Sequence, residues 1–373
     1  MDIKPKGDFF EEYNNEESAL VVNEGIEQPP IINPYVKTFF NNKNSALSFD
    51  EYMNGILAGD TTILSQAITL VESALPAHRT IAQKIIQKCQ ESALALKSMR
   101  IGITGVPGAG KSTFIESFGS LLTSTGHKLA VLAIDPSSER SKGSILGDKT
   151  RMETLCNDPN AFIRPSPTTG SLGGVARKTR ETILLCEAAG FDVIFIETVG
   201  VGQSETAVHS MSDFFLLLML SGAGDELQGI KRGIMEMSDL IAITKADGTN
   251  VSKATMAKAL YSNALHLFPP TESGWIPTAV TSSAVTKEGL PEILVKIKEY
   301  FSLVRKNGYY EKRRREQAQF WMYESINESL KNMFYENKMI EDLLPKYENA
   351  VLTGKLESFT AASELIDKYK LSK

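Results

Sequence analysis

The sequence predicts an α/β protein with a doubly wound, mainly parallel sheet, flanked by N-terminal and C-terminal helical extensions. Short apolar runs alternate with helical patterns, and each run is apolar throughout, as in strands buried on both faces of a parallel sheet. Polar motifs follow several runs, at the edge where open α/β sheets bind ligands. The expected strands are Ile101–Thr104, Leu129–Ile134, Val193–Ile196, Phe214–Leu220, Leu240–Thr244 and Thr278–Thr281.

Two regions precede this sheet. Residues 1–45 are polar and rich in turn residues, so we expect a poorly ordered lead-in. Apolar residues at helical spacing predict three helices in residues 46–98, and Asp60 or Thr61 is a candidate N-cap for the second helix. The expected buried faces carry Tyr52, Ile56 and Leu57, then Leu64, Ile68 and Val71, then Ile81, Ile85 and Ile86.

Residues 99–305 hold the predicted α/β domain, and residues 306–373 return to a helical, charged pattern. This C-terminal region opens on the basic run Glu311–Glu316, whose default interpretation is a solvated face. Apolar residues follow the run at Phe320, Trp321, Ile326, Leu330 and Phe334. Since they lie outside the α/β core, we expect a helical arm that forms a homodimer.

Composition excludes several classes of partner. The net charge of −5 and the charged fraction of 23% give no basic signal for nucleic acid. The longest apolar run, Phe214–Leu220, is far shorter than the roughly 20 residues of a membrane helix. No apolar stretch of a secretory signal opens the chain, and Cys89, Cys156 and Cys186 lack metal-ligand spacing. We expect a cytoplasmic protein with free thiols.

The segment Gly105–Ser112 fits G-x-x-x-x-G-K-[ST], the phosphate-binding P-loop. It lies between an expected strand and an expected helix, as the motif requires. Glycines let successive N–H groups point at phosphate oxygens, Lys111 reaches the outer phosphates, and the Ser112 hydroxyl ligates Mg²⁺. The nucleotide contacts expected here are Gly105, Val106, Gly108, Ala109, Gly110, Lys111, Ser112 and Thr113.

Thr244-Lys245-Ala246-Asp247 follows another strand and resembles the guanine-specificity motif [NT]-K-x-D. The Asp247 carboxylate would accept from guanine N1–H and the 2-amino group, which adenine lacks, while Lys245 would lie along the base. Thr244 stands where Asn is usual, and its hydroxyl offers fewer contacts for bracing the P-loop. After the last strand, Ser283-Ala284 resembles the loop whose backbone contacts the guanine carbonyl.

Two carboxylates end strands on the same edge as Lys111. Asp135 follows Leu129–Ile134, and Glu197 opens Glu197-Thr198-Val199-Gly200, a D-x-x-G pattern with Glu for Asp. Such carboxylates can hold Mg²⁺ through water, and Gly200 can offer its N–H to the γ-phosphate. The glycine-rich segment 221–233 follows a further strand, and we expect a moving loop.

The chain resembles the MeaB/ArgK-type P-loop GTPases, which chaperone adenosylcobalamin-dependent acyl-CoA mutases such as methylmalonyl-CoA mutase. The resemblance covers Ser48 to the C-terminus. It rests on G-V-P-G-A-G-K-S-T at 105–113, D-P-S-S at 135–138, G-D-K-T-R-M at 147–152, E-T-V-G-V-G-Q-S-E at 197–205, G-A-G-D-E-L-Q-G-I-K-R-G at 222–233 and T-K-A-D at 244–247.

The resemblance implies GTP as substrate, GDP as product, Mg²⁺ as cofactor and a mutase as partner. The implied roles are phosphate and Mg²⁺ binding by Lys111, Ser112 and Thr113, a metal-side acidic set of Asp135, Asp148 and Glu197, an approach to the phosphates by Arg151, and a third switch loop with Asp225, Gln228 and Lys231. We expect catalysis to depend on Lys111, Arg151, Glu197, Gln228 and Lys231. Since Val201 rather than Gln follows Gly200, we expect slow hydrolysis without a partner.

Two alternatives stay open. One is a GTPase for metal-centre assembly, of the hydrogenase or urease maturation type, which would need metal-binding Cys/His clusters. The other is an ATP-using small-molecule kinase, which would require that Asp247 does not read guanine. A comparison of GTP with ATP binding separates the kinase from the GTPases.

Overall fold

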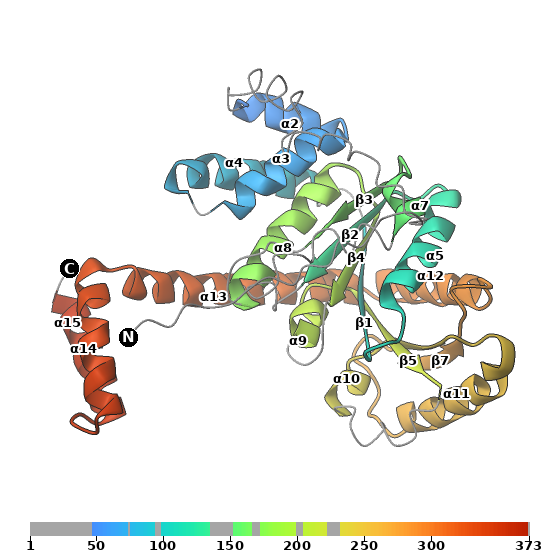
Figure 1. Ribbon diagram of the computed structural model, residues 1–373. Helices are drawn as coiled ribbons and strands as arrows, with labels where there is room; N and C mark the ends of the chain where they lie inside the picture. Colours follow the sequence, from blue (N-terminus) through green and yellow to red (C-terminus); the bar gives the residue numbers. More distant parts are fainter. Residues whose placement is uncertain are drawn as a thin grey trace, which may run out of the picture. The chain divides into compact units, whose positions relative to one another are not determined.

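The computed structural model describes residues 47–73, 75–93, 98–134, 152–165, 172–198, 204–221 and 232–371. In these ranges the chain forms a parallel seven-stranded sheet with strand order β3-β2-β4-β1-β5-β6-β7 (Figure 1). The strands are β1 Met99–Gly105, β2 Leu129–Ile134, β3 Ala161–Arg164, β4 Val193–Thr198, β5 Phe214–Leu220, β6 Leu240–Thr244 and β7 Thr278–Thr281. The predicted α/β class and the six expected strands are confirmed.

The sequence pattern missed the edge strand β3. Every residue of β1, β2 and β4 is buried, which explains their continuous apolar runs. In β3 only Phe162 is buried among four residues, because the strand pairs on one side only, with β2. A short edge strand therefore lacks the apolar signal on which the prediction depended.

Helices cover both faces of the sheet. One face packs against α5 Lys111–Ser124, α7 Glu153–Cys156 and α12 Leu290–Lys306. The other carries α8 Leu172–Ala188, α9 Ser204–His209, α10 Arg232–Glu236 and α11 Val251–Leu265. Close packing on this second face explains Gly102, where a Cβ would lie 2.8 Å from Val208 Cγ1 of α9. Within the described ranges, no helix is long and apolar enough to cross a membrane.

Three N-terminal helices pack against one another and against α8: α2 Phe49–Leu57, α3 Thr61–Glu72 and α4 Pro76–Ala93. The predicted cap of the second helix is confirmed, since Asp60 Oδ1 accepts from Thr62 N and Ile63 N. Leu57 was expected on the buried face but is 51% exposed. It is the last residue of α2, and helical spacing extended the buried face one position too far.

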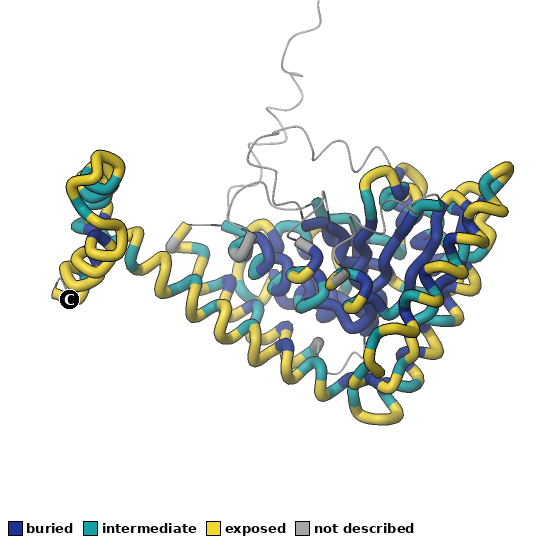
Figure 2. The backbone as a smooth tube through the Cα atoms, turned by 90° about the horizontal axis from the view of Figure 1, so that it is seen from below, coloured by how far each residue is buried: buried dark blue, intermediate teal, exposed yellow. Residues whose placement is uncertain are grey.

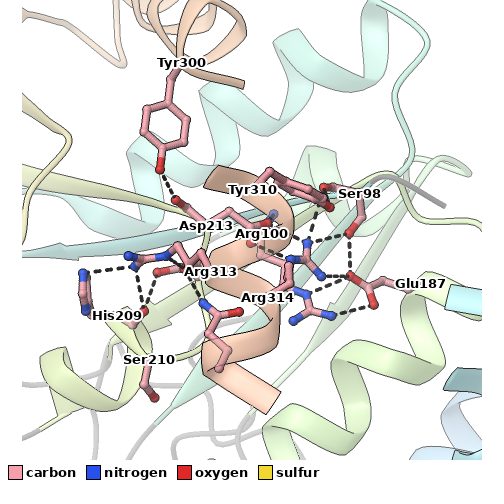
Figure 3. Close-up of polar contacts among 12 residues, drawn as sticks. Ser98, Arg100, Glu187, His209, Ser210, Asp213, Tyr300, Tyr310, Arg313 and Arg314 are labelled. Atoms are coloured by element: carbon pink, nitrogen blue, oxygen red, sulfur yellow. Dashed lines mark hydrogen bonds and ion pairs between the residues drawn. The ribbon is translucent and has the colours of Figure 1, made fainter. Parts of the chain in front are cut away.

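The C-terminal region forms α13 Tyr309–Tyr335, α14 Lys338–Leu352 and α15 Ser358–Leu371, whose residues are largely exposed (Figure 2). The first turns of α13 are anchored to the sheet (Figure 3). Arg314 Nε lies 2.6 Å from Asp213 Oδ1, and its Nη1 lies 3.2 Å from Glu187 Oε1. The interpretation of Glu311–Glu316 as a solvated face is therefore wrong for Arg314, whose partners come from β-strand and helix termini distant in sequence.

Arg313 is anchored as well. Its Nε donates to Ser212 O at 3.1 Å, and its Nη2 lies 3.1 Å from His209 Nε2 at the end of α9. Burial, with the Arg313 charge as a second cause, lowers the pKa of His209 to about 3. The neutral ring at this position can accept from Arg313. The basic run therefore contributes two structural arginines, while Lys312, Arg315 and Glu316 are exposed as expected.

Candidate nucleotide-binding site

The P-loop lies between β1 and α5, and its glycines are required by geometry. Gly108 and Gly110 both have φ of +77°, where a side chain is strained. Gly105 has a different role, because a Cβ there would lie 2.6 Å from Leu218 O of the neighbouring strand β5. The loop is thus a tight backbone turn held against β5, and Gly110 leads directly into α5.

Lys111 opens α5 and folds back over this loop. Its Nζ donates to Gly105 O at 3.1 Å. Burial lowers the pKa of Lys111, and the carboxylates of Glu197 and Glu205 oppose that shift. A partly desolvated cation at the start of a helix attracts phosphate more strongly than one in bulk water. Ser112 is half-buried and Thr113 exposed in the same helical turn.

Thr244 ends β6 and contacts the P-loop backbone. Its hydroxyl donates to Ala109 O at 2.8 Å, with Met219 O of β5 at 3.1 Å as a second acceptor within reach. The hydroxyl therefore braces the loop that the usual Asn would brace. Lys245 follows in a left-handed conformation with φ of 56°, and Asn250 Nδ2 donates to its carbonyl at 2.7 Å.

Asp247 is half-buried and is oriented by the expected Ser-Ala loop. Ser283 Oγ donates to Asp247 Oδ2 and accepts from the backbone N–H groups of Val285 and Thr286 at 3.2 and 3.1 Å. Ser117 of α5 in turn donates to Ala284 O at 2.8 Å. The carboxylate that would read the base is thus held by the loop after β7, and that loop is attached to the P-loop helix.

Glu197 lies at the end of β4 between β1 and β2, and it is 3% exposed. The next residue, Thr198, shares a 3.0 Å hydrogen bond with Thr104 of β1. The described residues contain no group of three His, Cys, Asp or Glu side chains able to hold a metal ion. Mg²⁺ commonly takes only one or two carboxylates and completes its shell with phosphate and water, so a Ser112 hydroxyl and a Glu197 carboxylate fit this ion.

The structure brings the described site residues to the carboxyl edge of β1, β4, β6 and β7. Seven expected site residues lie outside the described ranges: Asp135, Asp148, Arg151, Gly200, Asp225, Gln228 and Lys231. Sequence reasoning missed Asn250 and Ser117, which support the two base-side loops. It also missed Glu205, a residue of the 197–205 motif that is 7% exposed and acts on the pKa of Lys111. Glu205 lies in α9, which is too short for its sequence pattern to show which residues are buried.

A parallel sheet with a P-loop, a returning lysine and a T-K-A-D loop at one edge defines the class of P-loop nucleotide-binding proteins. Residues 64–339 match the family model described as methylmalonyl Co-A mutase-associated GTPase MeaB. The chain belongs to this family of GTPases.

Curated relatives agree with this assignment. A putative GTPase of Caulobacter vibrioides is 48% identical over 87% of this chain and 99% of its own length. The methylmalonic aciduria type A homolog of Mus musculus, a protein named as mitochondrial, is 45% identical over 86% of this chain and 79% of its own. GTPase ArgK of Escherichia coli is 43% identical over 82% of this chain and 91% of its own length.

A solved structure described as LAO/AO transport system kinase is also similar. It aligns with a TM-score of 0.67 and 34% identity, covering 87% of this chain and all of that one. The fold is therefore shared over 87% of this chain.

Proposed function

We propose that this protein is a Mg²⁺-dependent GTPase that chaperones an adenosylcobalamin-dependent acyl-CoA mutase, gating cofactor loading and protecting the mutase. One observation carries the nucleotide part of the proposal. Asp247 is oriented by Ser283, while Thr244 of the same loop donates to Ala109 O of the P-loop. The base-reading carboxylate and the phosphate loop are thus held in one hydrogen-bonded frame.

Guanine selectivity follows from the chemistry of this frame. The Ser283 hydroxyl holds Asp247 Oδ2, and guanine N1–H and its 2-amino group offer two donors to such a carboxylate. Adenine offers no donor at these positions. Binding of ATP would therefore remove water from the carboxylate without providing hydrogen bonds in its place. Sites of this kind discriminate by roughly 10⁴-fold or more.

The nucleotide preference is testable by calorimetry. Wild-type protein should bind GDP and not ADP, whereas Asp247→Asn should prefer XDP, because an amide can donate where the carboxylate accepted. Asp239→Asn is a matched control, since Asp239 lies at the opposite edge of the sheet. Equal affinity of the wild type for ADP and GDP would support a small-molecule kinase and overturn the GTPase proposal.

Hydrolysis in this proposal uses Lys111 on the phosphates and Ser112 with Glu197 on Mg²⁺, which would neutralise the charge that develops on the phosphates. Arg151, Gln228 and Lys231 remain proposed catalytic or switch residues, and Asp135 and Asp148 proposed metal-side acids. We propose that turnover is slow until a mutase binds.

The mutase partner is supported by the family assignment and by the relative named for methylmalonic aciduria. GTP turnover should rise when an adenosylcobalamin-dependent acyl-CoA mutase of the same organism is added. In Lys231→Ala and Gln228→Ala we expect near-normal GDP affinity with a blunted rise. Without any rise in the wild type, the chain would remain a GTPase with another client.

We also propose a homodimer through α13. Beyond its anchored first turns, Tyr323, Ile326, Leu330 and Met333 are each at least 46% exposed. They lie at intervals of three, four and three residues, the spacing of a stripe that packs against a second helix. A second copy of the chain would cover this stripe.

Light scattering tests the dimer. Ile326→Asp with Leu330→Asp should give a monomer that still binds GDP, because the stripe lies outside the nucleotide edge. Met256→Asp is the control, since Met256 is 69% exposed on α11. A dimer that survives the double substitution would place the interface elsewhere.

A further inference from the structure

The P-loop helix makes a hydrogen bond to the loop that follows β7. Ser117 lies six residues after Lys111 on α5, and its hydroxyl donates to Ala284 O at 2.8 Å. Both residues are half-buried, so this hydrogen bond is partly shielded from water. It joins the phosphate-binding helix to the base-side loop, although the two residues are 167 positions apart in sequence.

The peptide group between Ala284 and Val285 is held on both sides. Its carbonyl accepts from Ser117, and its N–H, which belongs to Val285, donates to Ser283 Oγ at 3.2 Å. A peptide group is planar, so its carbonyl and its N–H cannot turn independently. Fixing the carbonyl on α5 therefore also fixes the direction in which the N–H points at the Ser283 hydroxyl.

The Ser283 hydroxyl connects this peptide group to the carboxylate of Asp247. Ser283 is fully buried, and its Oγ accepts from Val285 N and Thr286 N. A hydroxyl has one proton, and Ser283 donates it to Asp247 Oδ2. Because two N–H groups occupy the acceptor side of this oxygen, the proton is directed at the carboxylate. A chain of three hydrogen bonds thus leads from α5 to Asp247.

The sheet holds only the beginning of the same loop. Ser282 N donates to Ile243 O at 2.8 Å, and Ser282 O accepts from Ala246 N at 3.0 Å. Val285, three residues further on, is 79% exposed, so the loop turns outward after Ser283. The backbone bonds of Ser282 do not reach this outer part, whereas the hydrogen bond from α5 does.

We propose that Ser117 is a positioning residue for guanine recognition, which acts from the P-loop helix through the peptide group after Ala284 to orient the Asp247 carboxylate. The proposal rests on the proposed function, in which Asp247 reads guanine. Ser117 does not contact the nucleotide in this role. Its removal should weaken the discrimination between bases while leaving the binding of phosphate nearly unchanged.

Three ligands separate base reading from phosphate binding: GDP, inosine diphosphate (IDP) and inorganic pyrophosphate. Inosine lacks the 2-amino group of guanine, so IDP offers Asp247 one donor where GDP offers two. The ratio of the GDP and IDP affinities therefore reports how well the carboxylate is oriented. In Ser117→Ala we expect GDP affinity to fall roughly five- to tenfold, and IDP affinity to fall less. Pyrophosphate affinity should stay within about twofold of wild type, because the P-loop itself is unchanged.

A second substitution tests the route through Ser283. Ser283→Ala removes the hydroxyl that joins the peptide group to Asp247, so adding Ser117→Ala to it should not lower the GDP-to-IDP ratio further. Ser124→Ala is the matched control. The Ser124 hydroxyl is exposed on the same helix and donates to Leu121 O of that helix at 2.8 Å. The ratio in this control should equal that of wild type.

The outcomes distinguish this role from the proposed function. Three results would each overturn the positioning role while GDP is still preferred to ADP. They are an unchanged ratio in Ser117→Ala, a loss of pyrophosphate affinity equal to that of GDP, and an equal drop of the ratio with and without the Ser283 hydroxyl. Equal wild-type affinity for ADP and GDP overturns the proposed function instead. If Ser117→Ala does not fold, Ser117→Cys undergoes the same comparison, because a thiol is a weak donor.

Discussion

The two edges of the sheet use the same residue types in opposite ways. At the amino edge, Glu187 accepts from Arg100 at 2.8 Å and from Arg314 at 3.2 Å (Figure 3). Its carboxylate is therefore fully engaged in ion pairs with guanidinium groups. At the carboxyl edge, Lys111 donates to a backbone carbonyl and Asp247 accepts from a neutral hydroxyl. These hydrogen bonds orient the two charged groups without placing either of them in a direct ion pair.

Buried charges stabilise the fold at the amino edge, whereas at the carboxyl edge they are available to bind a ligand. A buried ion needs compensation, and at the amino edge the protein provides it for the Glu187 carboxylate. The Arg100 and Arg314 charges, together with the Ser98 hydroxyl, lower the pKa of Glu187 to about 2 although burial alone would raise it. At the carboxyl edge the Glu197 and Glu205 carboxylates compensate the Lys111 charge in part. Phosphate would supply the rest, and the base would supply donors to Asp247.

The largest expected effect is on stability at the amino edge. Glu187→Ala leaves the buried Arg100 and the half-buried Arg314 without their shared partner, so the free energy of unfolding should fall by about 3–5 kcal/mol. Glu299→Ala, which removes an exposed pair with Lys296, should cost under about 1 kcal/mol. Urea titration measures both. A small loss in Glu187→Ala would mean that the network is not structural.

The loss of stability at acidic pH tests the same difference between the two edges of the sheet. The folded-state pKa of Glu187, about 2, lies below the ordinary value of 4.5. Its contribution is therefore complete above pH 4.5 and is lost as pH falls toward 2. The difference in stability between wild type and Glu187→Ala should shrink over that window, whereas a constant difference would contradict the assignment of the charge.

At the carboxyl edge the effect should appear in turnover rather than stability. Lys111→Ala removes a cation from the phosphates and should lower GTP turnover by roughly 10²-fold or more, with little change in the midpoint of thermal unfolding. Lys298→Ala, an exposed lysine of α12, is the control. Turnover equal to wild type in Lys111→Ala would remove the P-loop from the mechanism.

The smallest effect concerns Asp239, a half-buried carboxyl at the amino edge that has only partial compensation. Burial raises the pKa of Asp239 to about 7, the Asp213 carboxylate adds to the shift, and Arg313 and the Phe215 N–H oppose it. The folded state thus holds a proton that the unfolded state has lost, so stability falls as pH rises from about 4 to 7.

Asp239→Asn cannot ionise, and its amide oxygen can still accept from Phe215 N, which lies 2.8 Å from Asp239 Oδ2. Its advantage over wild type should therefore grow as the pH rises from 4 to 8. Chemical unfolding at several pH values measures this difference. Parallel pH profiles for the two proteins would contradict the raised pKa.

Local patterns in the sequence were sufficient to predict much of the fold and of the candidate site. The P-loop, the T-K-A-D motif, the Asp60 cap and six strands depend on neighbouring residues, because backbone conformation and burial periodicity are set over short stretches of chain. Residues of the lead-in, and seven expected site residues such as Arg151, lie outside the described ranges, and their roles stay predictions.

Which groups distant in sequence meet depends on the tertiary structure. Ser283 reaches Asp247 across 36 residues, Arg314 reaches Glu187 across 127, and Thr154 N reaches Glu116 across 38. A run such as Glu311–Glu316 looks the same in sequence whether its arginines face water or a buried carboxylate. Their partners depend on the crossing of strands and helices, and burial then decides whether such a charge stabilises the fold or is left for a ligand.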